Sequence, residues 1–142
     1  MSIETYVNFN GNCREAVEYY AEVFETKKPE FMSFEEAPED PDMALPLEAR
    51  HLIMHVGLEI EGSMILFSDT FPDRPVTPGN NISLVISTDD RARIETLFNR
   101  MKNEGTVEME LQETFWSKCY GSLIDKFGIV WQFNHDDGTE MQ

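Results

Sequence analysis

The chain contains one pattern of secondary-structure elements twice, and this internal repeat constrains its fold more than any other feature. Each copy reads as a strand, an amphipathic helix and a closing hairpin, in the same order. The copies cover residues 1–70 and 80–135, and a proline-rich linker at 71–79 joins them. The repeat predicts one α+β domain over 1–142, in which two tandem βαβββ modules enclose a cavity.

The two helices are the clearest part of the repeat. Residues 13–24 and 90–101 each place apolar side chains three and four positions apart, which is typical of a helix with one buried face. Residues that commonly cap helices precede both segments, namely Asn10 or Asn12 and Thr88 or Asp89. Strands are expected over 5–9, 31–34, 51–60, 63–68, 82–86 and 106–111, followed by a final hairpin around 126–128.

Charge and hydropathy limit the partners that the chain can have. Eleven basic and 27 acidic residues give a formal net charge of −16. A field of that sign repels nucleic acids and anionic membrane surfaces, so neither partner is expected. No apolar run approaches the length of a membrane span.

The cysteines and the first residues indicate where the protein works. Only Cys13 and Cys119 are available for a disulfide, and the chain does not start with the basic and apolar pattern of a signal peptide. Both observations favour free thiols in a reducing cytoplasm.

The segment between the first helix and residue 50 departs from the repeat. It holds four prolines and an acidic cluster, which forbid long regular elements. After a short strand, a mobile acidic loop is expected over 35–50, either as a lid or as a solvated insertion.

Several longer motifs carry a family resemblance. They are Tyr6–Tyr20, Met54-His55, Gly62–Asp69, Gln112-Glu-Thr-Phe-Trp116, Tyr120-Gly121 and Asp125–Trp131. With them the chain resembles the vicinal oxygen chelate superfamily, which includes glyoxalase I, extradiol dioxygenases and bleomycin-resistance proteins, and in particular its PhnB-like, 3-demethylubiquinone-methyltransferase-like branch. The resemblance implies a U-shaped mixed sheet around the cavity, often in a homodimer. It implies little about chemistry, because one fold serves many reactions.

The resemblance also supplies a test for a metal site. Metal-dependent members carry His, Gln or Glu at one position on the first strand and one on the last strand of each module. Those positions correspond here to Thr5, Leu66, Asn81 and Gln132. Leucine cannot bind a metal ion, and threonine and asparagine bind divalent ions weakly. No metal site and no cofactor are therefore expected, and a shift of one residue would not restore the ligand set.

Hairpin geometry predicts which side chains line the concave face. A first turn at 61–62, and a second hairpin in which Ile124 pairs with Ile129, give each pairing register. A glycine, Gly57 or Gly121, then lies opposite the former metal position in each module. The same registers place five polar side chains on that face: His55, Ser68, Cys119, Gln132 and Asn134.

His55 is the strongest catalytic candidate, because an imidazole transfers protons near neutral pH, although a histidine hydrogen-bonded within the sheet explains it equally well. Cys119 would be a nucleophile if a neighbouring base lowered its pKa, but an unreactive strand residue is the favoured reading. Phe115 and Trp116 suit either a pocket wall or dimer packing. The candidate ligand-binding residues are Thr5, Ser68, Asn81, Trp116, Cys119, Gln132 and Asn134.

Three functions are compatible with this sequence. The one it favours is a PhnB-like protein that binds a small molecule without a metal, with polar contacts at His55 and Gln132. The second is a lyase or isomerase in which His55 acts as an acid–base catalyst, or as a metal ligand with His51. The third is a structural or regulatory homodimer whose cavity is filled by its own side chains.

Overall fold

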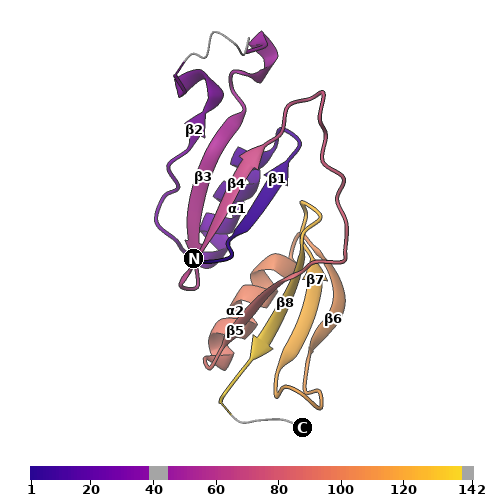
Figure 1. Cartoon of the computed structure of the whole chain (residues 1–142). Helices are drawn as coiled ribbons and strands as arrows, with labels where there is room; N and C mark the ends of the chain where they lie inside the picture. Colours follow the sequence, from indigo (N-terminus) through magenta and orange to yellow (C-terminus); the bar gives the residue numbers. More distant parts are fainter. Residues whose placement is uncertain (39–44, 139–142) are drawn as a thin grey trace. The chain divides into compact units, whose positions relative to one another are not determined.

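The computed structural model describes residues 1–38 and 45–138. The chain divides into two compact units, Met1–Thr77 and Pro78–Gln142. Each unit contains a strand, a helix and three further strands in that order (Figure 1). Each also forms its own four-stranded mixed sheet, which confirms the α+β class and the two tandem βαβββ modules.

The first unit is built from β1 (Thr5–Phe9), α1 (Cys13–Phe24), β2 (Met32–Ser33), β3 (Ile53–Ile60) and β4 (Ser63–Asp69). Its sheet has the order β1-β4-β3-β2, with β1 parallel to β4 and the other neighbours antiparallel. Short 3₁₀ helices at Phe34–Glu36 and Leu47–Ala49 belong to the segment predicted as an acidic loop. The centre of that loop, 39–44, lies outside the described residues.

The second unit is built from β5 (Leu84–Thr88), α2 (Arg91–Lys102), β6 (Thr106–Gln112), β7 (Tyr120–Ile124) and β8 (Val130–His135). Its sheet has the order β5-β8-β7-β6, with β5 parallel to β8. Ile65 pairs with Thr5 in one unit, and Trp131 pairs with Leu84 in the other. The first residues of β1 and β5, Thr5 and Leu84, are thus paired at equivalent places in the two units. Within the described residues, no helix is long and apolar enough to cross a membrane.

One helix covers one face of each sheet, as the apolar spacing predicts. The buried side chains are Cys13, Ala16, Val17, Tyr20, Val23 and Phe24 in α1, and Ile94, Leu97, Phe98 and Met101 in α2. The ring of Tyr20 stacks on Phe67 of β4 with centroids 5.8 Å apart, and Phe98 meets Phe133 of β8 edge-on at 5.5 Å. These contacts make a separate two-layer core in each unit.

The start of α1 is capped from outside the helix. Asn12 precedes α1 but makes no side-chain capping bond. The buried carboxylate of Asp69, at the end of β4, instead accepts hydrogen bonds from the backbone N–H groups of Gly11 and Cys13, both at 2.9 Å. A carboxylate at this position also opposes the positive end of the helix dipole.

The start of α2 lies one residue beyond the expected cap. Asp90, rather than Thr88 or Asp89, precedes the helix and accepts a hydrogen bond from the backbone N–H of Arg93 at 3.1 Å. This is the usual N-cap arrangement, in which a side-chain oxygen satisfies a free N–H of the first turn.

The predicted register is confirmed for the first hairpin. Ile60 pairs with Ser63, and Gly57 with Leu66. The turn residues Glu61 and Gly62 both have positive φ, 48° and 88°. Two positive φ values are the signature of the two-residue turn that joins tightly paired antiparallel strands.

The predicted register of the second hairpin is wrong by one residue. Ile124 pairs with Val130 rather than with Ile129, because the turn is one residue longer than expected. The carboxylate of Asp125 holds this longer turn by accepting hydrogen bonds from the N–H groups of Phe127 at 2.8 Å and Ile129 at 3.0 Å. Since side chains alternate along a strand, the shift reverses the faces assigned to residues of β7.

Candidate functional site

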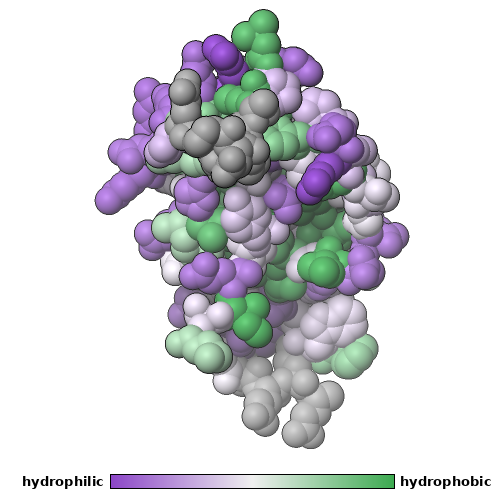
Figure 2. All heavy atoms as spheres, turned by 45° about the horizontal axis from the view of Figure 1, so that its top comes forward, coloured by the Kyte–Doolittle hydropathy of each residue, from purple (hydrophilic) through white to green (hydrophobic). Residues whose placement is uncertain are grey.

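Each sheet has a second face that the helix of its own unit does not cover, called here the open face. In the first unit it carries Tyr6, Asn8, His55, Gly57, Leu66 and Ser68. The structurally equivalent residues of the second unit are, in the same order, Val85, Ser87, Tyr120, Ser122, Gln132 and Asn134. Tyr6 is 47% exposed and Val85 is 52% exposed. In Figure 2, hydrophobic side chains reach the surface among hydrophilic ones.

The assignment of strand positions to metal ligands, which the family resemblance implied, needs a correction. Tyr6, not Thr5, lies beside Leu66, because Thr5 pairs with Ile65. Thr5 therefore does not share a face with Leu66, since side chains of neighbouring strands alternate in step.

The same correction applies to the second unit. Val85 lies beside Gln132 in the parallel pair of β5 and β8, whereas Asn81 is an exposed residue that precedes β5. An aliphatic side chain, Leu66 or Val85, thus occupies one of the two positions in each unit, and it has no lone pair for a metal. The residues do not fit the superfamily's metal pattern. In the described part of the chain, no group of three or more His, Cys, Asp or Glu residues is arranged to hold a metal ion.

His55 lies on the open face of the first unit, as expected, and is exposed. Its ring centroid is 6.5 Å from that of Tyr6, and Met32 of β2 is its cross-strand partner. The exposed imidazole therefore lies beside the Tyr6 ring, with Met32 opposite it on the neighbouring strand.

A hydroxyl–amide pair occurs on both open faces. In the first unit, the Ser68 hydroxyl donates to Asn8 Oδ1 at 2.9 Å. In the second unit, Asn134 Nδ2 donates to the Ser87 hydroxyl at 3.4 Å. The two residue types have exchanged strands, yet the same pair recurs at equivalent positions. Within the described residues, Asn134 Oδ1 is shielded from solvent and accepts no hydrogen bond.

Gln132 is the centre of a hydrogen-bonded chain on the open face of the second unit. The Tyr120 hydroxyl donates to Gln132 Oε1 at 2.6 Å, and Gln132 Nε2 donates to Ser83 Oγ at 2.7 Å. Burial, together with the nearby Glu108 carboxylate, raises the pKa of the Tyr120 phenol, so this hydroxyl stays protonated and can donate. Neither Tyr120 nor Ser83 was among the predicted ligand-binding residues, and the correct register of the second hairpin would have indicated Tyr120.

Trp116 joins this group from the loop before β7. Its ring meets Tyr120 edge-on at 5.2 Å and Phe115 edge-on at 4.7 Å. Trp116 is 42% exposed and Phe115 is 74% exposed. Two of the predicted ligand-binding residues thus contact Tyr120. Trp116 lies beside its ring, and Gln132 accepts a hydrogen bond from its hydroxyl.

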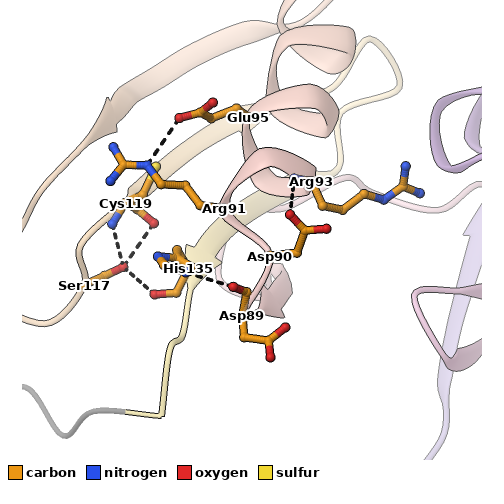
Figure 3. Close-up of polar contacts among 8 residues, drawn as sticks. All are labelled: Asp89, Asp90, Arg91, Arg93, Glu95, Ser117, Cys119 and His135. Carbon is orange, nitrogen blue, oxygen red and sulfur yellow. Dashed lines mark hydrogen bonds and ion pairs between the residues drawn. The ribbon is translucent and has the colours of Figure 1, made fainter.

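Cys119 does not lie on the open face, which corrects the sequence-based placement. The one-residue shift puts Tyr120, not Cys119, opposite Asn134. Cys119 is buried, and both its backbone N–H and its carbonyl bond the hydroxyl of Ser117 (Figure 3). Burial raises the pKa of its thiol, which keeps it protonated and weakly nucleophilic.

Gly121 likewise does not face Gln132, because Ser122 takes that place. A Cβ atom on Gly121 would lie 2.9 Å from both Leu111 Cδ2 and Phe98 Cε2. The glycine therefore allows close packing under α2 and leaves no room for a ligand. Gly57 alone keeps the predicted position, opposite Leu66.

Known proteins share this architecture and much of the sequence. The sequence model of the family described as 3-demethylubiquinone-9 3-methyltransferase matches residues 1–134. The chain belongs to this family. It is 30% identical to protein YjdN of Escherichia coli, over 94% of this chain and 95% of that protein. It is 32% identical to protein PA1353 of Pseudomonas aeruginosa, whose crystal structure matches with a TM-score of 0.81 over 94% of this chain and 96% of that one.

More distant structures share the fold alone. A putative 3-demethylubiquinone-9 3-methyltransferase, PhnB protein, from Bacillus cereus is 24% identical, with a TM-score of 0.67 over 94% of this chain and 98% of that chain. A glyoxylase/bleomycin resistance protein/dioxygenase domain from Frankia is 12% identical, with a TM-score of 0.62 over 94% and 95% of the two chains. The family match confirms the expected PhnB-like branch, and these structures confirm the glyoxalase-like fold.

Proposed function

We propose that the chain is a small-molecule-binding protein that uses the open faces of its sheets and works without the metal site of its superfamily. One observation carries the proposal. Each open face combines exposed apolar or aromatic surface with a side chain that can form further hydrogen bonds, His55 in the first unit and Gln132 in the second. Small-molecule sites typically have this composition, a mostly apolar lining with a few placed polar groups.

Leu66 and Val85 support the metal-free part of the proposal, since each replaces a ligand with an aliphatic side chain. The proposal also includes a homodimer in the cytoplasm. The family resemblance supports the dimer, and the two buried, free thiols suit a reducing compartment.

A second candidate function is acid–base catalysis by His55, as in a lyase or isomerase. The observation that favours it is an exposed imidazole in ring contact with Tyr6. The variant His55→Gln distinguishes binding from catalysis, because glutamine keeps a hydrogen-bonding side chain but cannot transfer protons at neutral pH. Catalysis predicts that the variant still binds a substrate but no longer converts it. Unchanged turnover would exclude His55 as the catalyst.

The binding proposal is tested by screening metal-free protein against a chemically broad compound library and mapping each binder by two-dimensional NMR. S-adenosylmethionine belongs in the library, because the family description names a methyltransferase. Binders are expected to shift resonances on the open faces, including those of His55 or Gln132, and to bind equally well with a chelator present. Binding that needs a divalent metal, or shifts confined to the helix-covered faces, would contradict the proposal.

A further inference from the structure

The loop before β7 holds its aromatic side chains on a rigid turn. The backbone N–H of Thr114 donates to the Ser117 carbonyl at 2.8 Å, and the Ser117 N–H donates to Thr114 Oγ1 at 3.1 Å. The buried Ser117 hydroxyl also shares its one proton between the carbonyls of Cys119 and His135, at 3.0 and 3.2 Å (Figure 3). Phe115 and Trp116, between Thr114 and Ser117, are thus displayed by a fixed backbone.

The aromatic row consists of Phe115, Trp116 and Tyr120. Its neighbouring rings meet at 84° and 73°, close to perpendicular. An edge-to-face row of this kind leaves ring faces available for stacking. The two members that lie in the loop are well exposed, Phe115 at 74% and Trp116 at 42%. Exposed aromatic rings on a rigid support bind planar ligands with little loss of conformational entropy.

A hydrogen-bonded polar chain lies next to the row. The Tyr120 hydroxyl donates to Gln132 Oε1, and Gln132 Nε2 donates to Ser83 Oγ, so a hydroxyl holds each end of the amide. A primary amide has two N–H donors, and Ser83 accounts for one of them. The second N–H of Gln132 is available for an acceptor such as a carbonyl oxygen.

The charges around the row disfavour an anion. Glu108 acts electrostatically on Tyr120. The two basic side chains nearest along the sequence are each paired with a carboxylate. They are Lys118 with Asp137 at 2.6 Å and Lys126 with Glu104 at 3.2 Å. An anionic ligand would therefore meet a carboxylate, while the nearby cations are already paired.

We propose that the aromatic row and Gln132 form a subsite for an uncharged planar ring that carries a carbonyl oxygen. The ring stacks on Trp116, and its carbonyl accepts a hydrogen bond from Gln132 Nε2. This inference rests on the proposed function, because it names the class of small molecule that the open face of the second unit takes.

The test uses the whole protein and three matched probes: carbostyril, which is a neutral bicyclic lactam, its fully saturated analogue, and its carboxylated analogue. Affinities are measured by NMR titration, following the indole N–H of Trp116 and the side-chain amide of Gln132. Carbostyril is expected to shift both signals and to bind about tenfold more tightly than either analogue, since one analogue cannot stack and the other is charged. Equal or tighter binding of either analogue would overturn the proposal.

Variants separate stacking from hydrogen bonding. Trp116→Leu is expected to weaken the binding of carbostyril about tenfold. Trp116→Phe, which keeps a ring, is expected to weaken binding less. Gln132→Glu replaces the Nε2 donor with an acceptor oxygen and is expected to weaken the binding of carbostyril by a similar factor. Phe127→Leu changes an aromatic residue in the turn at the opposite end of the β7–β8 hairpin and serves as the control with unchanged affinity.

The outcomes also separate this inference from the proposed function. If other compounds shift the open faces but carbostyril does not bind, the ring subsite is wrong and the binding function stands. If no compound of the library shifts either open face, both fail. A folded Trp116→Leu variant with unchanged affinity for carbostyril would by itself contradict the stacking role.

Discussion

Two buried aspartates show how single residues tie strands, helices and turns together. Asp69 accepts three backbone hydrogen bonds, from Gly11 and Cys13 beside α1 and from Ile53 at the start of β3. Asp125 also accepts three hydrogen bonds in the second unit. Two come from the backbone N–H groups of Phe127 and Ile129, and the third comes from the indole N–H of Trp131 at 2.8 Å. A buried carboxylate with three donors is stable because its charge is compensated by hydrogen bonds.

Asp69→Asn is expected to lower the free energy of unfolding by about 2–4 kcal/mol, because the amide turns one acceptor into a donor facing N–H groups. Urea unfolding measures the change. Asp73→Asn, at an exposed position of the same unit, is the matched control and is expected to have almost no effect. A loss as small as that of the control would show that the three hydrogen bonds contribute little.

The buried thiol of Cys13 gives a pH dependence with a definite sign. Burial, with the Asp69 carboxylate nearby, raises its pKa from 9.0 to about 12. The folded state therefore holds this proton more tightly than the unfolded state, and the stabilisation is fully present below pH 9 and lost as the pH rises towards 12.

The stability difference between wild type and Cys13→Ala is expected to shrink between pH 9 and pH 11, as measured by urea unfolding at each pH. Cys119→Ala provides the comparison for the second buried thiol. A difference that grows with pH would mean that the Cys13 thiolate is stabilised in the folded protein. In the folded state at pH 8, both thiols are expected to react slowly with thiol reagents.

At the scale of elements, the hydrophobic pattern predicts most of the fold, and local turn chemistry decides where it fails. The helix over 13–24 and the first hairpin follow from apolar spacing and from a two-residue turn whose type the sequence indicates. The predicted register of the second hairpin is wrong because the side chain of Asp125 stabilises a longer turn through hydrogen bonds from residues that follow it. In the register that this longer turn sets, Cys119 and Gly121 do not lie on the predicted open face, and Tyr120 does.

Two glycine variants test these registers. Gly121→Ala is expected to destabilise the protein by about 1–3 kcal/mol, since the added methyl would overlap the Leu111 and Phe98 side chains and lie 3.1 Å from the Met109 carbonyl oxygen. Gly57→Ala is the matched change on the open face, where the nearest atom is the flexible Met64 sulfur at 3.0 Å. Thermal and urea unfolding are expected to rank Gly121→Ala as the more harmful, and the reverse order would contradict the assigned faces.

At the scale of the whole molecule, the two units have sheets of equivalent topology whose open faces differ in chemistry. The first unit presents Tyr6 and His55, and the second presents Tyr120 and Gln132. The sequence indicated His55 and Gln132 because residue type and alternation are visible in it. It did not indicate the hydrogen-bonded chain through Ser83, because that contact joins residues 49 positions apart.

Native mass spectrometry of freshly purified, untagged protein, with metal analysis of the same sample, is the most direct test of the central claim. The account predicts no stoichiometric divalent metal, and an added mass of one organic molecule per chain when a binder from the library is present, unchanged by a chelator. A stoichiometric divalent metal whose removal abolishes that binding would contradict it and would direct attention to His51 and His55 as ligands.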